Sequence, residues 1–178
     1  MSKRLRIVVC VVLALSEIAL DGHAEAAAEV DLPHACQALF GAVLKGDARK
    51  ITQALARGAD LNCRTVPAGT TALMVAVTNG PLAAVEPFLR KGVDINAQDS
   101  AGSTALMFAA MLGHDEVVRA LLKKGAEAGI KNKNGQTAMD LAKDSDDMSM
   151  TTRDGKDMPQ LRRSGRVKVI EILTEASR

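Results

Sequence analysis

The chain has 178 residues, 47% of them hydrophobic and 25% charged, which predicts a single domain with a core of ordinary size. It contains no Trp, no Tyr and 3 Phe, so the core must be aliphatic, which suits closely packed short helices. A formal net charge of +2 is too mild to require an anionic partner. Nucleic-acid binding typically shows a dense basic stripe interleaved with aromatic residues. Neither feature is present in this sequence, so we expect no nucleic-acid partner.

Residues 1–26 have the three-part layout of a secretory signal peptide. A basic start (KRLR) precedes an unbroken apolar run over residues 7–15, and the segment ends in Ala-Glu-Ala, which matches the A-x-A cleavage rule. The apolar run is too short to span a membrane, which takes about 20 residues. We expect cleavage after Ala26, with Ala24 or Ala28 as alternatives, and a short linker over residues 27–33.

We expect export to place the mature protein in the periplasm with no membrane association, and secretion or an uncleaved N-terminal membrane anchor are the alternatives. Cys36 and Cys63 are the two cysteines that remain after cleavage. In an oxidising compartment they can form a disulfide, which would stabilise the fold by roughly 3 kcal/mol. The alternative is two unpaired thiols, because sequence does not show how closely the two β-carbons approach.

The next segments repeat one pattern. Thr71, Thr104 and Thr137 lie 33 residues apart, and glycines recur at the same interval. In each copy a Thr opens a short apolar helix (TALMFAAMLG), and a second helix with apolar residues at helical spacing follows (DEVVRALLKKG). A glycine ends that second helix. One such pair of helices cannot bury its apolar face alone, so we expect the copies to stack.

This pattern resembles the ankyrin repeat, whose 33-residue unit carries T-P-L-H-x-A, then G-H, then a G-A-D-x-N ending. The chain has TALMVA and TALMFA, then GHDEVV, and the endings GADLN, GVDIN and GAEAG. The resemblance covers residues 34–178. It implies an all-α ankyrin-repeat solenoid of four helix-turn-helix units with short hairpin loops, at about residues 34–65, 66–98, 99–131 and 132–178.

Departures from the family pattern give further expectations. The family's His, which bonds the opening Thr, is replaced by Met74, Met107 and Asp140, so each repeat should lose one buried polar pair. Pro87 lies inside a predicted second helix, where we expect a kink or a shortened helix. Gln37 stands at the Thr position of the first unit, which indicates an N-terminal cap.

The last unit contains a long insert. Its second helix, RVKVIEILTEA from Arg166, arrives 19 residues late, so an insert must lie within residues 144–165. A loop of this length is usually functional or disordered. Disorder and contact with a partner both stay open for it.

Catalytic and metal-binding patterns are scarce in this sequence. After the predicted signal peptide, His34 and His114 are the only histidines, and no G-x-S-x-G, Walker or G-x-G-x-x-G motif occurs. His114 belongs to the G-H turn of the resemblance and is expected to be structural. We expect no enzyme activity, no cofactor and no metal.

The resemblance implies a concave face made of hairpin tips and first helices, where another protein would bind. Met111 and Leu112 are notable there, because both are large and apolar at positions that face solvent in the family; packing under the insert or against a neighbour is the alternative. Phe108 is expected in the core. Carried over by register, the partner-binding positions are, at the tips, Pro67, Ala68, Thr70, Ser100, Ala101, Ser103, Lys133, Asn134 and Gln136, and, on the first helices, Leu44, Lys45, Thr78, Asn79, Met111, Leu112, Asp144 and Ser145.

Taken together, the signal peptide and the repeats predict a monomeric, non-catalytic protein-binding module. The chain resembles small exported ankyrin proteins of bacteria, among them immunity or self-protection proteins that block a toxic lipase or a cell-wall hydrolase. The alternative is a scaffold or stress-support protein for a periplasmic enzyme such as a catalase. An exported effector directed at a host cell is a third class, against which the cleavable signal argues.

Overall fold

The computed structural model describes residues 34–65, 67–79, 81–144 and 159–176. Contacts divide the chain into two parts, Met1–Asp31 and Leu32–Arg178, and every described residue belongs to the second part. The predicted signal peptide and linker lie outside the described residues, as do residues 145–158 of the predicted insert. Their boundaries stay predictions.

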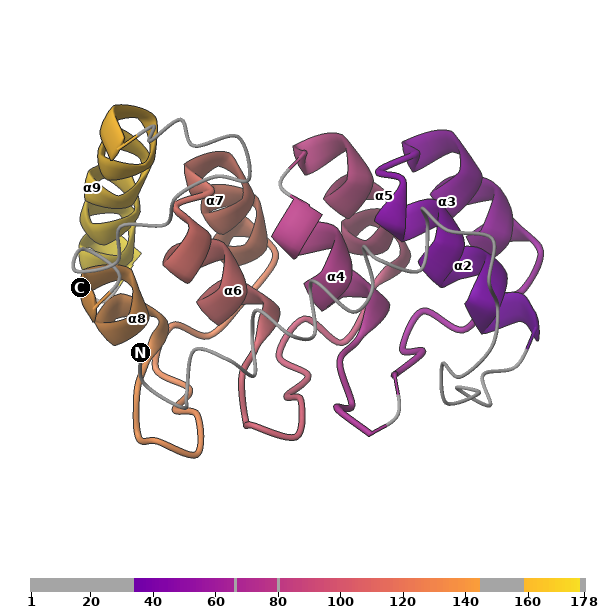
Figure 1. The fold of residues 1–178 in the computed structure, drawn as a ribbon, viewed down its shortest axis with the longest axis horizontal. Coiled ribbons are helices and arrows are strands. Elements are labelled where there is room, and N and C mark those ends of the chain that lie inside the picture. Colours follow the sequence, from indigo (N-terminus) through magenta and orange to yellow (C-terminus); the bar gives the residue numbers. More distant parts are fainter. Residues whose placement is uncertain (1–33, 66, 80, 145–158, 177–178) are drawn as a thin grey trace. The chain divides into compact units, whose positions relative to one another are not determined.

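Eight α-helices and no β-strand make up the regular structure of the described residues. They form four consecutive pairs (Figure 1). The first helix of each pair packs beside the first helix of the next, and the second helices do the same. The stacked helix-turn-helix units that the repeat predicts are therefore confirmed. The helices are α2 His34–Leu44, α3 Ala48–Ala56, α4 Ala72–Asn79, α5 Leu82–Lys91, α6 Ala105–Leu112, α7 Asp115–Lys123, α8 Ala138–Asp144 and α9 Pro159–Ala176.

The repeated threonines cap the first helices. The hydroxyl oxygen of Thr71 accepts a hydrogen bond from the N–H of Met74 at 3.2 Å, and that of Thr104 accepts one from Met107 at 3.4 Å. Each bond satisfies one of the N–H groups that a helix leaves unpaired at its first turn. The Thr of the repeat thus fixes where each of these helices begins.

In the last unit the cap is reciprocal. Thr137 accepts from the N–H of Asp140 at 3.3 Å, while the Asp140 carboxylate accepts from the Thr137 N–H at 2.9 Å and from its hydroxyl at 2.7 Å. This is a capping box in which Asp replaces the usual Glu. The expectation that every repeat loses its polar pair is wrong here, because Asp140 takes the place of the missing His as the partner of Thr137.

The two kinds of helix are buried differently. The first helices of the two inner pairs, α4 and α6, lie between neighbours and are buried nearly all round; Leu73 and Leu106, for example, are each 1% exposed. Second helices are amphipathic and bury one face. The residues that the second helices contribute to the shared hydrophobic core are Ile51 and Leu55 of α3, Ala84, Val85, Phe88 and Leu89 of α5, Val117, Val118 and Leu121 of α7, and Val169, Ile172 and Leu173 of α9.

Two expectations about the second helices are corrected. Helix α5 continues through Pro87 and has 10 residues, against 9 in both α3 and α7, so the predicted shortening does not occur. The predicted kink stays a prediction. Helix α9 begins at Pro159, seven residues before Arg166, so the final part of the predicted insert, residues 159–165, is helical.

A disulfide joins Cys36 and Cys63. Cys36 lies in the first turn of α2 and Cys63 near the middle of the loop between α3 and α4, with their Cα atoms 5.9 Å apart. That separation is in the usual range for a disulfide. Both residues are buried, so the disulfide lies inside the core. It ties α2 to the loop that follows α3.

Candidate functional site

The hairpin loops between the helix pairs are bonded to one another. The N–H of Ser100 donates to the carbonyl of Ala68 at 2.9 Å, and one unit later the N–H of Lys133 donates to the carbonyl of Ala101 at the same distance. The loops project from one side of the stack (Figure 1). Their tips therefore form one connected row of backbone instead of three independent loops.

Side chains at equivalent positions extend this connection. The guanidinium of Arg64 donates to the carbonyl of Gly69 in its own loop at 3.2 Å and to that of Gln98 in the next unit at 2.7 Å. The amide of Gln98 repeats the arrangement, donating to Gly102 at 2.7 Å and to Lys131 at 3.2 Å. Each side chain thus fixes its own loop and holds the next one in register.

The asparagine of the repeat ending makes a second set of links. Asn62 accepts from the N–H of Asp94 at 3.3 Å, and Asn96 accepts from the N–H of Glu127 at 3.0 Å. Asn96 also donates to the Glu127 carboxylate at 3.1 Å. These bonds join consecutive loops near the ends of the second helices and help to set the spacing of the loops.

The predicted tip residues are mostly accessible, with one exception. Thr70 is 6% exposed and lies in the interior next to Thr71, so its side chain does not belong to the contact surface. This corrects the register-based assignment. Of the other tip positions, Pro67, Ser100, Ala101, Lys133 and Asn134 are exposed, and Ala68, Ser103 and Gln136 are half-buried.

The predicted positions on the first helices lie near the C-terminal ends of adjacent helices. Asn79 uses its amide to donate to the carbonyl of Val43 at 2.7 Å, so it links α4 to α2, a structural role that sequence reasoning missed. The hydroxyl of Thr78 donates to its own helix. In the last pair, the Asp144 carboxylate accepts from the amide of Gln136 at 2.7 Å, which joins a tip position to a helix position. Ser145 lies outside the described residues.

Three large apolar residues stand at these helix ends. Leu44 is 41% exposed, and Met111 and Leu112 are half-buried. None of the three belongs to the core cluster of the described residues, whereas Phe108, one turn earlier, packs against it. The helix ends therefore offer apolar side chains that the described core does not take up.

The family model described as "Ankyrin repeats (3 copies)" matches two overlapping segments, residues 39–132 and 73–149, which together cover more than half of the chain. The chain belongs to the ankyrin-repeat family. No curated protein matched it. The family description names three copies, so our assignment of four repeats to the four helix pairs stays a prediction.

Ankyrin repeats are protein–protein interaction modules and are typically non-catalytic. Within the described residues, His, Cys, Asp and Glu do not gather in any group of three that could hold a metal ion. Nor is any described helix both long and apolar enough to cross a membrane. The family and the loop row therefore direct attention to surfaces and not to a catalytic cleft.

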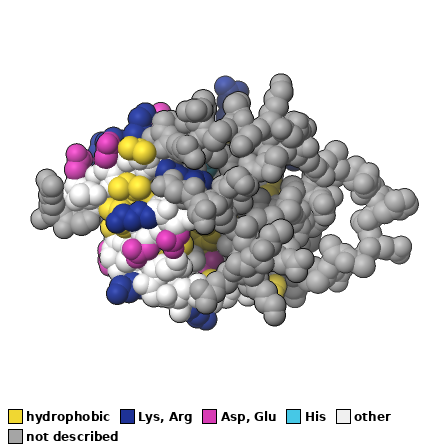
Figure 2. Space-filling model, turned by 60° about the vertical axis from the view of Figure 1, so that its left-hand side comes forward, with side chains coloured by type: hydrophobic (Ala, Val, Ile, Leu, Met, Phe, Trp, Pro, Cys, Tyr) yellow, Lys and Arg dark blue, Asp and Glu magenta, His cyan; other side chains and the backbone are white. Residues whose placement is uncertain are grey.

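Figure 2 shows one face of this ankyrin-repeat chain. On its described part, side chains of both charges are interspersed around small groups of hydrophobic side chains. The two carboxyl groups with shifted pKa values are both helix caps. The backbone N–H of Lys50 lowers the pKa of Asp47, and the backbone N–H of Thr137, followed by its hydroxyl, lowers the pKa of Asp140. These shifts indicate capping and not catalysis, because each carboxylate is held by its own helix.

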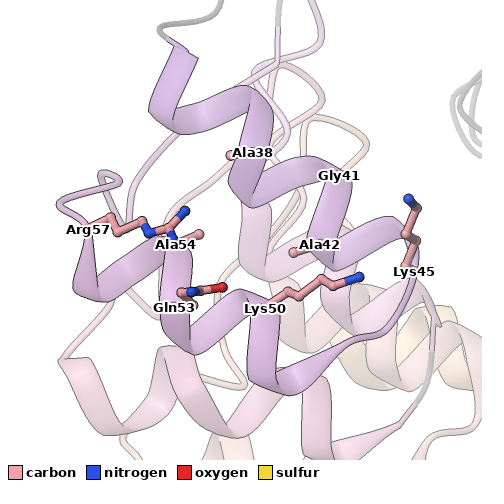
Figure 3. A pocket seen from close by; sticks show the side chains of 8 residues that line it. All are labelled: Ala38, Gly41, Ala42, Lys45, Lys50, Gln53, Ala54 and Arg57. Atoms are coloured by element: carbon pink, nitrogen blue, oxygen red, sulfur yellow. The ribbon is translucent and has the colours of Figure 1, made fainter.

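Sequence reasoning also missed a groove between α2 and α3 (Figure 3). Its volume is about 390 Å³, and Lys45 is the one predicted contact residue that lines it. The only local signal was Gly41, a glycine in the middle of a predicted helix.

Proposed function

We infer that this ankyrin-repeat protein is a non-catalytic binding protein of the bacterial periplasm, and that it protects the cell by inhibiting a secreted or cell-wall enzyme. The export pattern of residues 1–26 motivates the compartment. The disulfide between Cys36 and Cys63 suits an oxidising environment. The family supports binding to another protein.

The observation that carries the proposal is the row of bonded loops beside the exposed ends of the first helices. Because each loop is bonded to the next, little conformational freedom remains to be lost when a partner binds. Met111 and Leu112 at the end of α6 and Leu44 at the end of α2 supply apolar contacts, and Lys45, Thr78, Asn79 and Asp144 are the polar residues at equivalent positions of the other first helices. An apolar centre with a polar rim is the usual composition of a protein interface.

A capture experiment tests the binding face. Tagged protein is used to recover partners from the cell-envelope fraction of its own organism, and the recovered protein is identified by mass spectrometry. We expect one dominant enzyme, and we expect Met111→Asp with Leu112→Asp to lower its recovery about tenfold or more, as for interface hot spots. Ala83→Asp is the matched control, because Ala83 is exposed on α5, a second helix and not one of the first helices whose ends form this face.

Unfolding curves of each variant establish that loss of recovery is not loss of fold. Equal recovery by the wild-type protein and the Met111/Leu112 variant, with both folded, would count against this face. An activity assay of the recovered enzyme then decides its role: inhibition by the purified protein supports the proposal, whereas stimulation favours the scaffold alternative.

The compartment has its own test. N-terminal sequencing of the protein from fractionated cells is expected to begin at Ala27 in the periplasmic fraction. Recovery of the chain with residues 1–26 still attached, in a fraction other than the periplasm, contradicts export with cleavage.

A further inference from the structure

The groove between α2 and α3 has a small apolar floor and a basic rim (Figure 3). The later helices lie behind these two in that view, so the groove opens away from the rest of the stack. Helices α2 and α3 pack on α4 and α5 on their other side. The floor consists of Ala38, Gly41, Ala42 and Ala54, and the rim of Lys45, Lys50, Gln53 and Arg57.

Comparison with the inner helix pairs shows how the groove arises. Gly41 corresponds by register to Val75 and Phe108 of the inner pairs, and these larger residues are buried or half-buried between two neighbouring pairs. In the same way Ala54 corresponds to Phe88 and Leu121, which are fully buried. The first pair has small residues at these positions, and the missing side-chain volume leaves the groove.

Capping of the stack explains only part of this composition. Lys50 stands where the inner pairs have Ala84 and Val117, and a charged residue there keeps an end surface polar, as terminal repeats require. Gly41 does not serve that purpose. Within a helix, glycine costs about 1 kcal/mol relative to alanine. A Cβ atom at Gly41 would have nothing within 4 Å, so packing within the described chain does not require a glycine.

The charge of this region is distinctive. Residues 34–57 contain one acidic side chain, Asp47, and four basic ones, Lys45, Arg49, Lys50 and Arg57, a net charge of 4 − 1 = +3, whereas the whole chain carries +2. The Asp47 carboxylate is engaged in capping α3, where it accepts from the N–H groups of Arg49 and Lys50. Its ion pair with Lys50 is 3.5 Å long and Lys50 is 63% exposed, so the ammonium group is free to reorient.

We propose that this groove binds an acidic amphipathic helix of a partner protein. The small floor at Gly41 and Ala42 allows a helix backbone to approach closely, at the place where a preceding helix pair would stack in a longer array. Lys50 and Arg57 are seven residues apart on and just beyond α3, about 10 Å along the helix axis. Carboxylates two turns apart on the bound helix match that spacing. The groove is separate from the loop row, with Lys45 near both surfaces.

Binding of designed peptides to the purified protein tests this. The probe is a fluorescein-labelled Ala- and Leu-rich helical peptide with Glu residues two turns apart, measured by fluorescence anisotropy. One control peptide has Gln in place of Glu, and another keeps the Glu residues but has a central Pro that breaks the helix. We expect the Kd of the Gln control to be about five- to tenfold higher, the range for a pair of partly exposed ion pairs. The Kd of the Pro control should rise by at least as much, because a central Pro costs a helix about 3 kcal/mol.

Two variants locate the site. Lys50→Glu with Arg57→Glu is expected to raise the Kd of the Glu peptide about tenfold or more, since attraction becomes repulsion. Arg119→Glu with Lys123→Glu on α7 is the matched charge control and should leave the Kd unchanged, because both side chains are exposed away from the groove. Gly41→Leu is expected to abolish binding by filling the groove while raising the unfolding midpoint, because leucine is the better helix former.

Each of three outcomes overturns the proposal. The first is equal binding of the Glu and Gln peptides, which removes the role of charge. The second is equal binding of the intact and Pro-broken peptides, which indicates a general anion surface and not a helix site. The third is unchanged binding by a folded Gly41→Leu variant, which places the peptide elsewhere.

Discussion

The disulfide between Cys36 and Cys63 offers the sharpest test of how this stack is stabilised. The perturbation is its removal, either by reduction of the wild-type protein or by Cys36→Ala with Cys63→Ala. Alanine is preferred to serine because both positions are buried, and a buried hydroxyl without a partner would add a cost of its own. Reduction of the wild-type protein leaves the composition unchanged and isolates the covalent bond.

The magnitude follows from the length of chain that the bond closes. Cys36 and Cys63 are 27 residues apart in sequence. For a closed loop of that length, the chain-entropy relation gives about 3.5 kcal/mol of stabilisation at 25 °C, through restriction of the unfolded chain. At about 2–4 °C per kcal/mol for a protein of this size, the unfolding midpoint should fall by roughly 10 °C.

Urea unfolding followed by circular dichroism, with and without reductant, measures the free energy. Native-state hydrogen exchange shows in which helices the stability is lost. Since each helix pair contacts only its neighbours, we expect faster exchange in α2 and α3 after reduction and little change in α6 and α7. The double Ala variant is the control and should show no response to reductant.

Two results would refute the reasoning. An unchanged midpoint in protein whose two thiols are shown by mass spectrometry to be free would mean that the bond contributes no net stabilisation. A uniform loss of protection across all helix pairs would mean that the stack unfolds as one unit, and not locally from the first pair.

Three further predictions concern the loops and caps. Gly102→Ala should lower the free energy of unfolding in urea by about 1–2 kcal/mol, because φ is 76° there and the new Cβ would lie 3.0 Å from the backbone nitrogen of Lys133. Gly135→Ala is the control, with the same φ and nothing within 4 Å of the new Cβ, and should lower it by less. Equal losses in the two variants would mean that the contact with Lys133 has no effect. Gln98→Ala removes two hydrogen bonds and should lower the free energy of unfolding by about 1 kcal/mol, an unchanged value being the contrary result. The pKa of Asp140 is lowered below 3.8 in the folded state, so the carboxylate stabilises the fold above pH 3.8, and this stabilisation is lost as the pH falls through the folded pKa. Asp140→Ala should therefore lose less stability than the wild-type protein between pH 7 and pH 3. Parallel plots of unfolding free energy against pH for the two proteins would contradict this.

Local signals made the helix pairs predictable. Thr71, Thr104 and Thr137 act through bonds to residues three positions later, which a periodic sequence displays directly. Contacts between units were not predictable in this way. The bond from Asn79 to the Val43 carbonyl and the link from Arg64 to Gln98 depend on how one pair is placed against the next. The start of α9 at Pro159 was missed because the repeat pattern by which the sequence identifies this helix begins only at Arg166.

Register alone also misjudged exposure at the candidate site. Thr70 was assigned to a loop tip by counting from its equivalents, yet it is buried, because the chain at Arg64 and Thr71 closes in a bridge that draws this residue inward. Its counterpart Ser103 is half-buried, so the same position changes its exposure between neighbouring loops. A contact surface inferred by register is therefore reliable for the backbone path and must be corrected residue by residue for the side chains.

The two surfaces of this molecule differ in what a substitution there would mean. Along the loop row, Gln98 and Arg64 hold adjacent loops together, so a variant that weakens binding there can do so by loosening the loops without touching the partner. At the groove, Gly41 has open space around it and substitution by a larger residue favours the helix. Loss of binding in a more stable protein has no structural explanation other than occlusion. The groove is for that reason the surface where a binding measurement can be interpreted without a separate account of folding.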